Sequence, residues 1–134
     1  MVDRRGAQDE DLTLRVQAKT SAGGGVPEIP SEATLLNEAV ERLVAALHPE
    51  RIYLFGSRAR GDAHGDSDYD FMVVVQERTG KGHSMERDAY AALSGLGVSK
   101  DVVVMSRAYF EWMCGAKASL PATVEREGRL LYAA

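Results

Sequence analysis

The chain has 134 residues, 45% of them hydrophobic and 27% charged, which is the composition of an ordinary soluble globular domain. Its net charge of -4 argues against direct nucleic-acid binding, and no apolar run approaches the roughly 20 residues of a membrane span. The only cysteine, Cys114, excludes an intrachain disulfide, and the N-terminus lacks the apolar segment of a secretory signal. These features predict a cytoplasmic protein.

Residues 1–30 differ in composition from the rest of the chain. They end in a Gly-rich linker sequence at residues 21–27, and alternating apolar residues at 12–18 are compatible with a short edge strand. We therefore expect a tail or short strand, and then a single folded domain over residues 31–134.

Helical and strand patterns follow one another from Ser31 onward. Ser31 is suited to cap a helix that ends at His48-Pro49, because the residue before a proline is pushed out of the helical region. Further helices are predicted at residues 84–96, 106–114 and 119–128, with a helical turn and then a loop over residues 58–67. Strands are predicted at residues 51–55, 69–75, 98–105 and 130–132. This order predicts an α/β (α+β) fold, a small mixed β-sheet with helices packed on it.

The most informative motif is Gly56-Ser57, followed after ten residues by Asp68-Tyr69-Asp70. Asp68 and Asp70 begin a predicted strand two residues apart, so both carboxylates face the same side. Like charges in such proximity repel unless a cation neutralises them. Mg²⁺ suits this arrangement, because it takes a few carboxylates together with phosphate oxygens of a substrate.

Asp101 supplies a third acid near the start of the next predicted strand. If the two strands are neighbours, Asp101 reaches the same point as Asp68 and Asp70. Three carboxylates can hold two Mg²⁺ ions about 4 Å apart, an arrangement that serves in-line displacement at a phosphorus atom. The predicted reaction is nucleotidyl transfer, with Asp101 as the general base or as the group that orients the acceptor hydroxyl.

The Gly-Ser turn is suited to bind the triphosphate. Gly56 lets the backbone approach a phosphate closely, and the N–H groups of the helical turn that follows attract anions. Ser57 adds a hydroxyl donor, and Arg58 and Arg60 can reach phosphate oxygens with bidentate geometry. Arg58 is favoured over Arg60 by its closeness to the turn, and both arginines can instead form surface salt bridges.

Other chemistry-bearing residues have plainer interpretations. His64, between the two halves of the motif, is expected to be a solvated loop residue. Tyr109, Phe110 and Trp112 lie at helical spacing and are expected in the core or on a partner surface. Arg78 follows a predicted strand and is assigned no role.

The sequence from Leu54 to Gly61, together with Ser67-Asp68-Tyr69-Asp70, resembles the minimal nucleotidyltransferases, the smallest members of the DNA polymerase beta superfamily. The resemblance covers about residues 31–132 and includes Asp101. It implies a polymerase beta-like palm fold. It also implies that Gly56 and Ser57 hold the triphosphate of ATP and that Asp68, Asp70 and Asp101 bind magnesium.

The same resemblance implies a biological role. Minimal nucleotidyltransferases act as antitoxins paired with a HEPN-domain ribonuclease toxin, and they transfer AMP from ATP to a tyrosine of that toxin. Two other functions stay open. One is nucleotidyl transfer to a small molecule of the aminoglycoside type, which requires an acceptor pocket. The other is a non-catalytic module that neutralises its partner by occlusion. The short chain leaves little surface to grip an acceptor, which favours an acceptor presented by a partner protein.

Overall fold

The structure, a computed structural model, describes residues 31–65 and 67–134. The predicted tail or strand within residues 1–30 lies outside these residues. The chain divides into two units, Met1–Glu38 and Ala39–Ala134, and the strands that the structure describes belong to the second unit.

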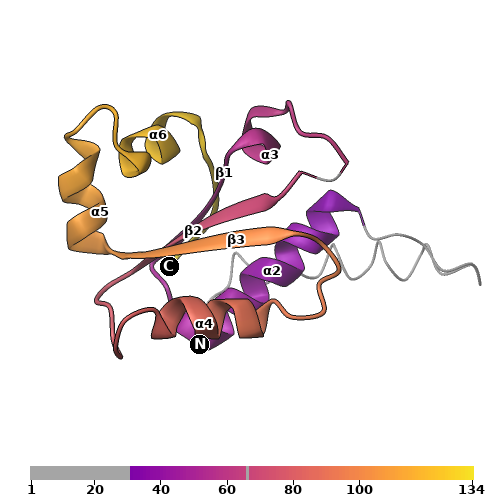
Figure 1. The fold of residues 1–134 in the computed structure, drawn as a ribbon, viewed down its shortest axis with the longest axis horizontal. Coiled ribbons are helices and arrows are strands. Elements are labelled where there is room, and N and C mark those ends of the chain that lie inside the picture. The colour runs from indigo at the N-terminus through magenta and orange to yellow at the C-terminus, as the bar shows by residue number, and fades with distance from the viewer. Residues whose placement is uncertain (1–30, 66) are drawn as a thin grey trace, which may run out of the picture. The chain divides into compact units, whose positions relative to one another are not determined.

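The observed elements follow the predicted order. The helices are α2 (Glu32–Leu47), α3 (Ser57–Arg60), α4 (Ser84–Ala92), α5 (Arg107–Cys114) and α6 (Leu120–Glu127). The strands are β1 (Arg51–Phe55), β2 (Tyr69–Val75), β3 (Lys100–Ser106) and β4 (Arg129–Ala133). They form one sheet in the order β3-β2-β1-β4, in which β1 runs antiparallel to β2 and β4 while β3 runs parallel to β2 (Figure 1). The predicted mixed sheet is therefore confirmed.

Helix caps were predictable where a serine precedes the helix. The hydroxyl of Ser106 accepts a hydrogen bond from the Tyr109 amide, and that of Ser119 accepts one from the Ala122 amide. Each serine satisfies an amide that the first turn of a helix leaves without a partner. None of the described helices is long and apolar enough to cross a membrane.

The segment between α4 and β3 differs from the prediction. Helix α4 ends at Ala92, before the predicted end near residue 96, and β3 begins at Lys100 instead of residue 98. Gly95 has a φ of 85°, which stops the helix. The Arg42 guanidinium donates hydrogen bonds to the carbonyls of Ala92, at 3.3 Å, and Ser94, at 2.8 Å. This tertiary contact holds the helix end and was not visible in the helical pattern.

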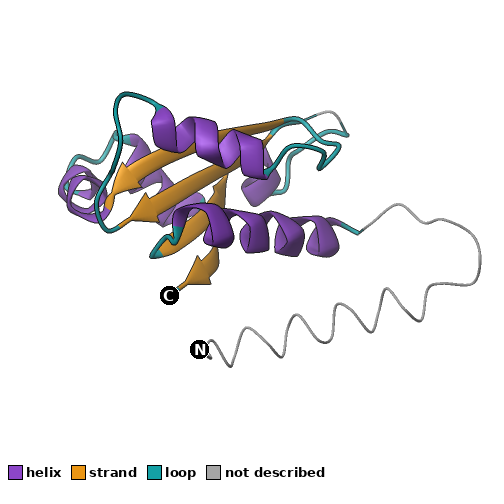
Figure 2. Ribbon diagram, turned by 90° about the horizontal axis from the view of Figure 1, so that it is seen from below, coloured by secondary structure: helices purple, strands orange, loops and turns teal. Residues whose placement is uncertain are grey.

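Apolar side chains cover both faces of the sheet within Ala39–Ala134. On one face, α4 lies beside the part of α2 that follows Glu38, as Figure 2 shows. On the opposite face, α5 and α6 lie over the sheet (Figure 1). They pack there in a core cluster formed by Tyr53, Met72, Val74, Phe110 and Val124. Apart from Asp70, strand β2 is buried on both sides, as the apolar character of residues 71–75 predicts.

Candidate functional site

The register of β2 and β3 brings two of the three predicted acids together. Asp70 lies directly opposite Asp101 in the parallel pair, and Phe55 lies opposite Asp70 on the other side. Because side chains alternate along a strand, Asp70 shares a face with Met72, which packs in the core under α5 and α6. The predicted meeting of Asp70 and Asp101 therefore depends on one register of β3 against β2.

The three acids interact electrostatically. Burial raises the pKa of the Asp70 carboxyl, and the neighbouring charges of Asp101 and then Asp68 raise it further, while Arg60 lowers it. Asp68 and Asp101 are exposed, and Asp70 is half-buried. The middle acid is thus surrounded by more negative than positive charge, which disfavours its ionised form.

The two outer acids are each held by a hydroxyl group. Ser99 donates a hydrogen bond to Oδ1 of Asp68, and Tyr90 donates one to Oδ1 of Asp101 at 2.5 Å. Neither hydroxyl was singled out in the sequence. Tyr90 belongs to no recognisable motif, and only the tertiary structure places α4 beside the start of β3.

Gly56 joins the predicted phosphate turn to the acids. Its backbone has φ 79° and ψ -159°, a conformation that is essentially restricted to glycine. A Cβ on this residue would collide with the Asp70 carboxylate. Ser57 then begins α3, a single turn that ends at Gly61. The backbone of Gly56 therefore lies against the Asp70 carboxylate, and only a residue without a side chain fits between them.

The two arginines of α3 have different surroundings. Arg58 donates hydrogen bonds to the carbonyls of Ser67, at 3.0 and 3.3 Å, and of Gly65, at 3.2 Å. Its guanidinium carbon also lies 4.2 Å from the ring centroid of Tyr69. Arg60 is more exposed, pairs with Asp62 at 3.4 Å, and acts on the charge of Asp70. Arg58 thus binds the loop before β2, whereas Arg60 lies among acids, and the phosphate contact predicted for these arginines stays a prediction.

The three acids form an open arrangement and not a closed metal site. No group of three carboxylate, imidazole or thiol side chains among residues 31–65 and 67–134 forms a ready cation cage. Asp68, Asp70 and Asp101 are nevertheless close enough for their charges to interact. An open set of mutually repelling carboxylates fits Mg²⁺, which is commonly bound by one or two carboxylates and by phosphates of the substrate. These residues therefore fit an ion that arrives with a triphosphate.

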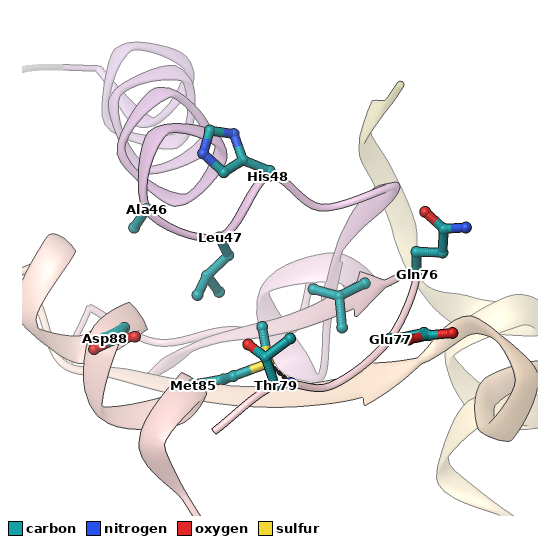
Figure 3. Close-up of a pocket in the computed structure, with 9 residues that line it drawn as sticks. Ala46, Leu47, His48, Gln76, Glu77, Thr79, Met85 and Asp88 are labelled. Carbon is teal, nitrogen blue, oxygen red and sulfur yellow. Dashed lines mark hydrogen bonds between the residues drawn. The ribbon is translucent and has the colours of Figure 1, made fainter. Parts of the chain in front are cut away.

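A separate hollow lies at the carboxyl end of β2 (Figure 3). Leu47 and Met85 line it together with the loop after β2, and the amide of Thr79 donates a hydrogen bond to the Met85 sulfur at 3.3 Å. The three acids lie near the opposite end of β2 and β3. The hollow is therefore not part of the candidate site.

The remaining sequence predictions divide between core and surface. Phe110 is fully buried, whereas Trp112 is 74% exposed and Tyr109 is 46% exposed. Phe110 is therefore a core residue, whereas Tyr109 and Trp112 lie on the side of α5 that faces away from the sheet, and a partner surface stays a prediction for these two. His64 is exposed in the loop, as expected. Arg78, which had no assigned role, forms hydrogen bonds with Glu86 at 2.8 and 3.0 Å.

One known protein family accounts for both the sheet and the motif. Residues 37–133 match the model of a family described as polymerase beta, nucleotidyltransferase. No curated protein sequence matches the chain.

Two solved structures share the fold. One is a candidate nucleotidyltransferase from Sulfolobus solfataricus, with a TM-score of 0.54 and 21% sequence identity over 83% of this chain and 93% of that one. The other is a toxin–antitoxin solved with AMP-PNP, with a TM-score of 0.55 and 22% identity over 74% of this chain and 73% of that one. The family match spans the sheet, the Gly-Ser turn and all three acids, and the chain therefore belongs to the polymerase beta nucleotidyltransferase family.

Proposed function

We propose that this protein is a magnesium-dependent nucleotidyltransferase that transfers AMP from ATP to a tyrosine of a HEPN ribonuclease toxin, and that it serves as the antitoxin of the pair. The observation that carries the proposal is the convergence of the Gly56 turn, Asp70 and Asp101 on neighbouring strands. A turn suited to phosphate beside an open set of acids fits a metal-bound triphosphate, which is the donor of nucleotidyl transfer.

The residues have distinct roles in this proposal. Gly56 and Ser57 receive the triphosphate, because the absence of a side chain at Gly56 lets phosphate approach the backbone. Asp68, Asp70 and Asp101 would hold up to two Mg²⁺ ions, which when bound neutralise the triphosphate and the leaving pyrophosphate. Arg60 contacts a phosphate oxygen, since Arg58 already binds the loop carbonyls.

In this proposal Asp101 acts on the acceptor. Tyr90 binds its Oδ1 atom, so Oδ2 can accept the proton of the acceptor hydroxyl or orient that hydroxyl toward the α-phosphorus. The new bond joins the acceptor oxygen to the α-phosphorus, and the bond to pyrophosphate breaks. The products are an adenylylated acceptor and pyrophosphate.

A protein acceptor is favoured by the exposure of the outer acids. Asp68 and Asp101 are exposed at the molecular surface, where a tyrosine carried by another protein can reach them. The similarity in fold to a toxin–antitoxin solved with AMP-PNP supports the same assignment. A small-molecule acceptor would require a pocket that encloses it.

The test is a transfer assay with radiolabelled ATP and Mg²⁺. The protein is incubated with the product of the adjacent gene and, separately, with a panel of aminoglycosides. We expect label on a tyrosine of the partner protein, identified by mass spectrometry. Label on an aminoglycoside would replace the proposal with a small-molecule transferase, and a tight complex without label would leave a non-catalytic binding module. Asp70→Asn is the control, in which label should disappear.

A further inference from the structure

The two outer acids receive their hydrogen bonds from one continuous part of the chain, α4 and the segment that leads into β3. We propose that Tyr90 is a positioning residue that holds Asp101 in place for the metal and the acceptor. The proposal rests on the proposed function, because it concerns a residue that supports one of the three acids.

The hydrogen bonds at Tyr90 show which group its hydroxyl donates to. The Val102 amide donates to the Tyr90 hydroxyl oxygen at 3.0 Å. A hydroxyl has one proton and accepts through its lone pairs, so Tyr90 remains free to donate that proton to Asp101. The bond to Asp101 measures 2.5 Å, the short length expected when the acceptor is a carboxylate. Tyr90 thus binds both the backbone of β3 and the acid carried by that strand.

The position of β3 explains why such support is needed. Among the strands that the structure describes, β3 is at the edge of the sheet, so Asp101 has a described neighbouring strand, β2, on one side only. Asp101 is exposed and lies opposite another acid, Asp70, from which charge repulsion pushes it away. A hydrogen bond from a helix-borne tyrosine opposes that movement and restricts the carboxylate to one orientation. Groups that orient metal ligands in this way affect metal affinity or activity by about 10–100-fold.

Tyr90 contributes less to the core of the protein than its size implies. The buried residues of α4 are Met85 and Ala89, and Tyr90 itself is 38% exposed. Replacement by phenylalanine keeps the ring and removes only the hydroxyl. The variant should therefore fold, and an effect on the site can be separated from a loss of structure.

The experiment compares the full chain with its Tyr90→Phe variant. Isothermal titration calorimetry measures the binding of Mg²⁺ in the presence of a non-hydrolysable ATP analogue, and a transfer assay gives kcat and the KM for ATP at saturating Mg²⁺. We expect the affinity for Mg²⁺ and kcat to fall about tenfold or more, the lower end of the effect of such supporting groups, with little change in KM for ATP. Tyr109→Phe, which changes another exposed tyrosine away from the site, should leave both unchanged.

A double-mutant cycle separates positioning from a general structural effect. In the Asp101→Asn background, Tyr90→Phe should cause no comparable further loss of Mg²⁺ affinity, because the carboxylate that it positions is gone. Equal losses of Mg²⁺ affinity in the wild-type and Asp101→Asn backgrounds would contradict the inference. If the wild-type protein binds Mg²⁺ in the presence of the analogue and Tyr90→Phe binds it equally well, the inference is also contradicted. A wild-type protein that binds no Mg²⁺ with the analogue would overturn the proposed function and this inference with it.

Mass spectrometry of the wild-type protein after incubation with Mg²⁺ and ATP alone completes the test. An unmodified Tyr90 supports positioning. AMP attached to Tyr90 would make that hydroxyl an acceptor and overturn its positioning role.

Discussion

An arginine binds backbone carbonyls of each of the two turns that flank strand β2. Before β2, Arg58 of α3 donates to the carbonyls of Gly65 and Ser67. In the turn after β2, Arg78 donates to the carbonyl of Gly82 and to that of Val104 in β3, both at 2.8 Å. Each guanidinium thus ties a turn to another part of the chain through two carbonyls.

The acids beside these turns differ. Arg78 also binds Glu86, and this hydrogen bond lowers the pKa of the Glu86 carboxyl. Burial and the charges of two other acids instead raise the pKa of Asp70. Similar contacts between an arginine and a turn therefore stand beside acids with opposite roles. An acid neutralised by an arginine stabilises the fold, whereas an acid left among other acids is available for a cation brought by a ligand.

The largest effect on activity should come from removing the charge of Asp70, the acid between Asp68 and Asp101. We expect Asp70→Asn to lower the transfer rate by about 100-fold or more, the order of effect seen when one charge-stabilising group is lost. It should also largely remove the rise in melting temperature that Mg²⁺ and ATP produce, because ligands stabilise by binding the native state. Calorimetry or thermal shift measures the second effect, and an unchanged shift would refute the assignment of the site.

The same variant should be at least as stable as the wild type when no metal is present. A raised pKa means that the folded state favours the protonated carboxyl, so the charged form costs stability at pH values above the ordinary range of the group. Asparagine removes that charge. A marked fall in the metal-free melting temperature would show that Asp70 is neutralised within the protein, as Glu86 is.

The next largest effect concerns Gly56. Gly56→Ala should destabilise the fold by about 1–3 kcal/mol, the cost of a residue held in a conformation suited to glycine, and should displace the Asp70 carboxylate. Gly61→Ala is the matched control, since Gly61 also has a positive φ, 89°, but an added Cβ there meets nothing within 4 Å. Chemical denaturation and transfer assays measure both effects. Equal loss of activity in the two variants would show that backbone strain, and not the contact with Asp70, is responsible.

Variants of the two arginines of α3 should separate an effect on ATP binding from an effect on stability. Arg60→Gln is expected to raise the KM for ATP about tenfold with little change in melting temperature, since a hydrogen bond to a charged group contributes roughly 1.5–3 kcal/mol. Arg58→Gln is expected to lower the melting temperature by a few degrees, because about 1 kcal/mol corresponds to about 4–8 °C in a domain of this size. The reverse pattern would return the phosphate contact to Arg58.

The smallest effect should come from the turn after β2. Glu86→Gln is expected to reduce stability by about 1 kcal/mol at neutral pH, the upper range for a partly exposed ion pair, and to leave transfer unaffected. Because the pKa of Glu86 is lowered, its contribution is present above the unfolded pKa of about 4.3 and is lost as the pH falls through the folded value. Denaturation curves of wild type and variant should therefore converge in acid. A difference that persists below that range would exclude the ion pair as its cause.

The sequence predicted the parts of the fold that depend on local patterns. The limits of β1 and β2 agree with the prediction, since Pro49 lies just before β1 and the apolar residues 71–75 make up most of β2. The end of α4 was predicted too late, and at the actual end Arg42, far away in the sequence, binds the carbonyl of Ala92. Local propensity cannot detect such a contact.

The candidate site shows the same division. Gly56, Asp68 and Asp70 were identifiable because their spacing is contained in one short segment. Tyr90 and Ser99 were missed, because a tyrosine in a helix and a serine before a strand carry no signal until the tertiary structure places them beside an acid. The preference for Arg58 over Arg60 as the phosphate contact rested on distance along the chain. That distance does not show that the Arg58 guanidinium binds the carbonyls of Gly65 and Ser67.

The parallel pairing of Asp70 with Asp101 has a consequence for how this protein tolerates change. The alignment that places these acids together also aligns the valines of β3 with the buried residues of β2, such as Val102 with Phe71. A shift of one residue would turn every side chain of β3 to the other face. An insertion near residue 99 would therefore disrupt the core and the chemistry in a single step, whereas an insertion in the loop at residues 62–65 leaves that alignment intact. Selection for a stable core and selection for activity therefore act on the same feature, the register of β3 against β2.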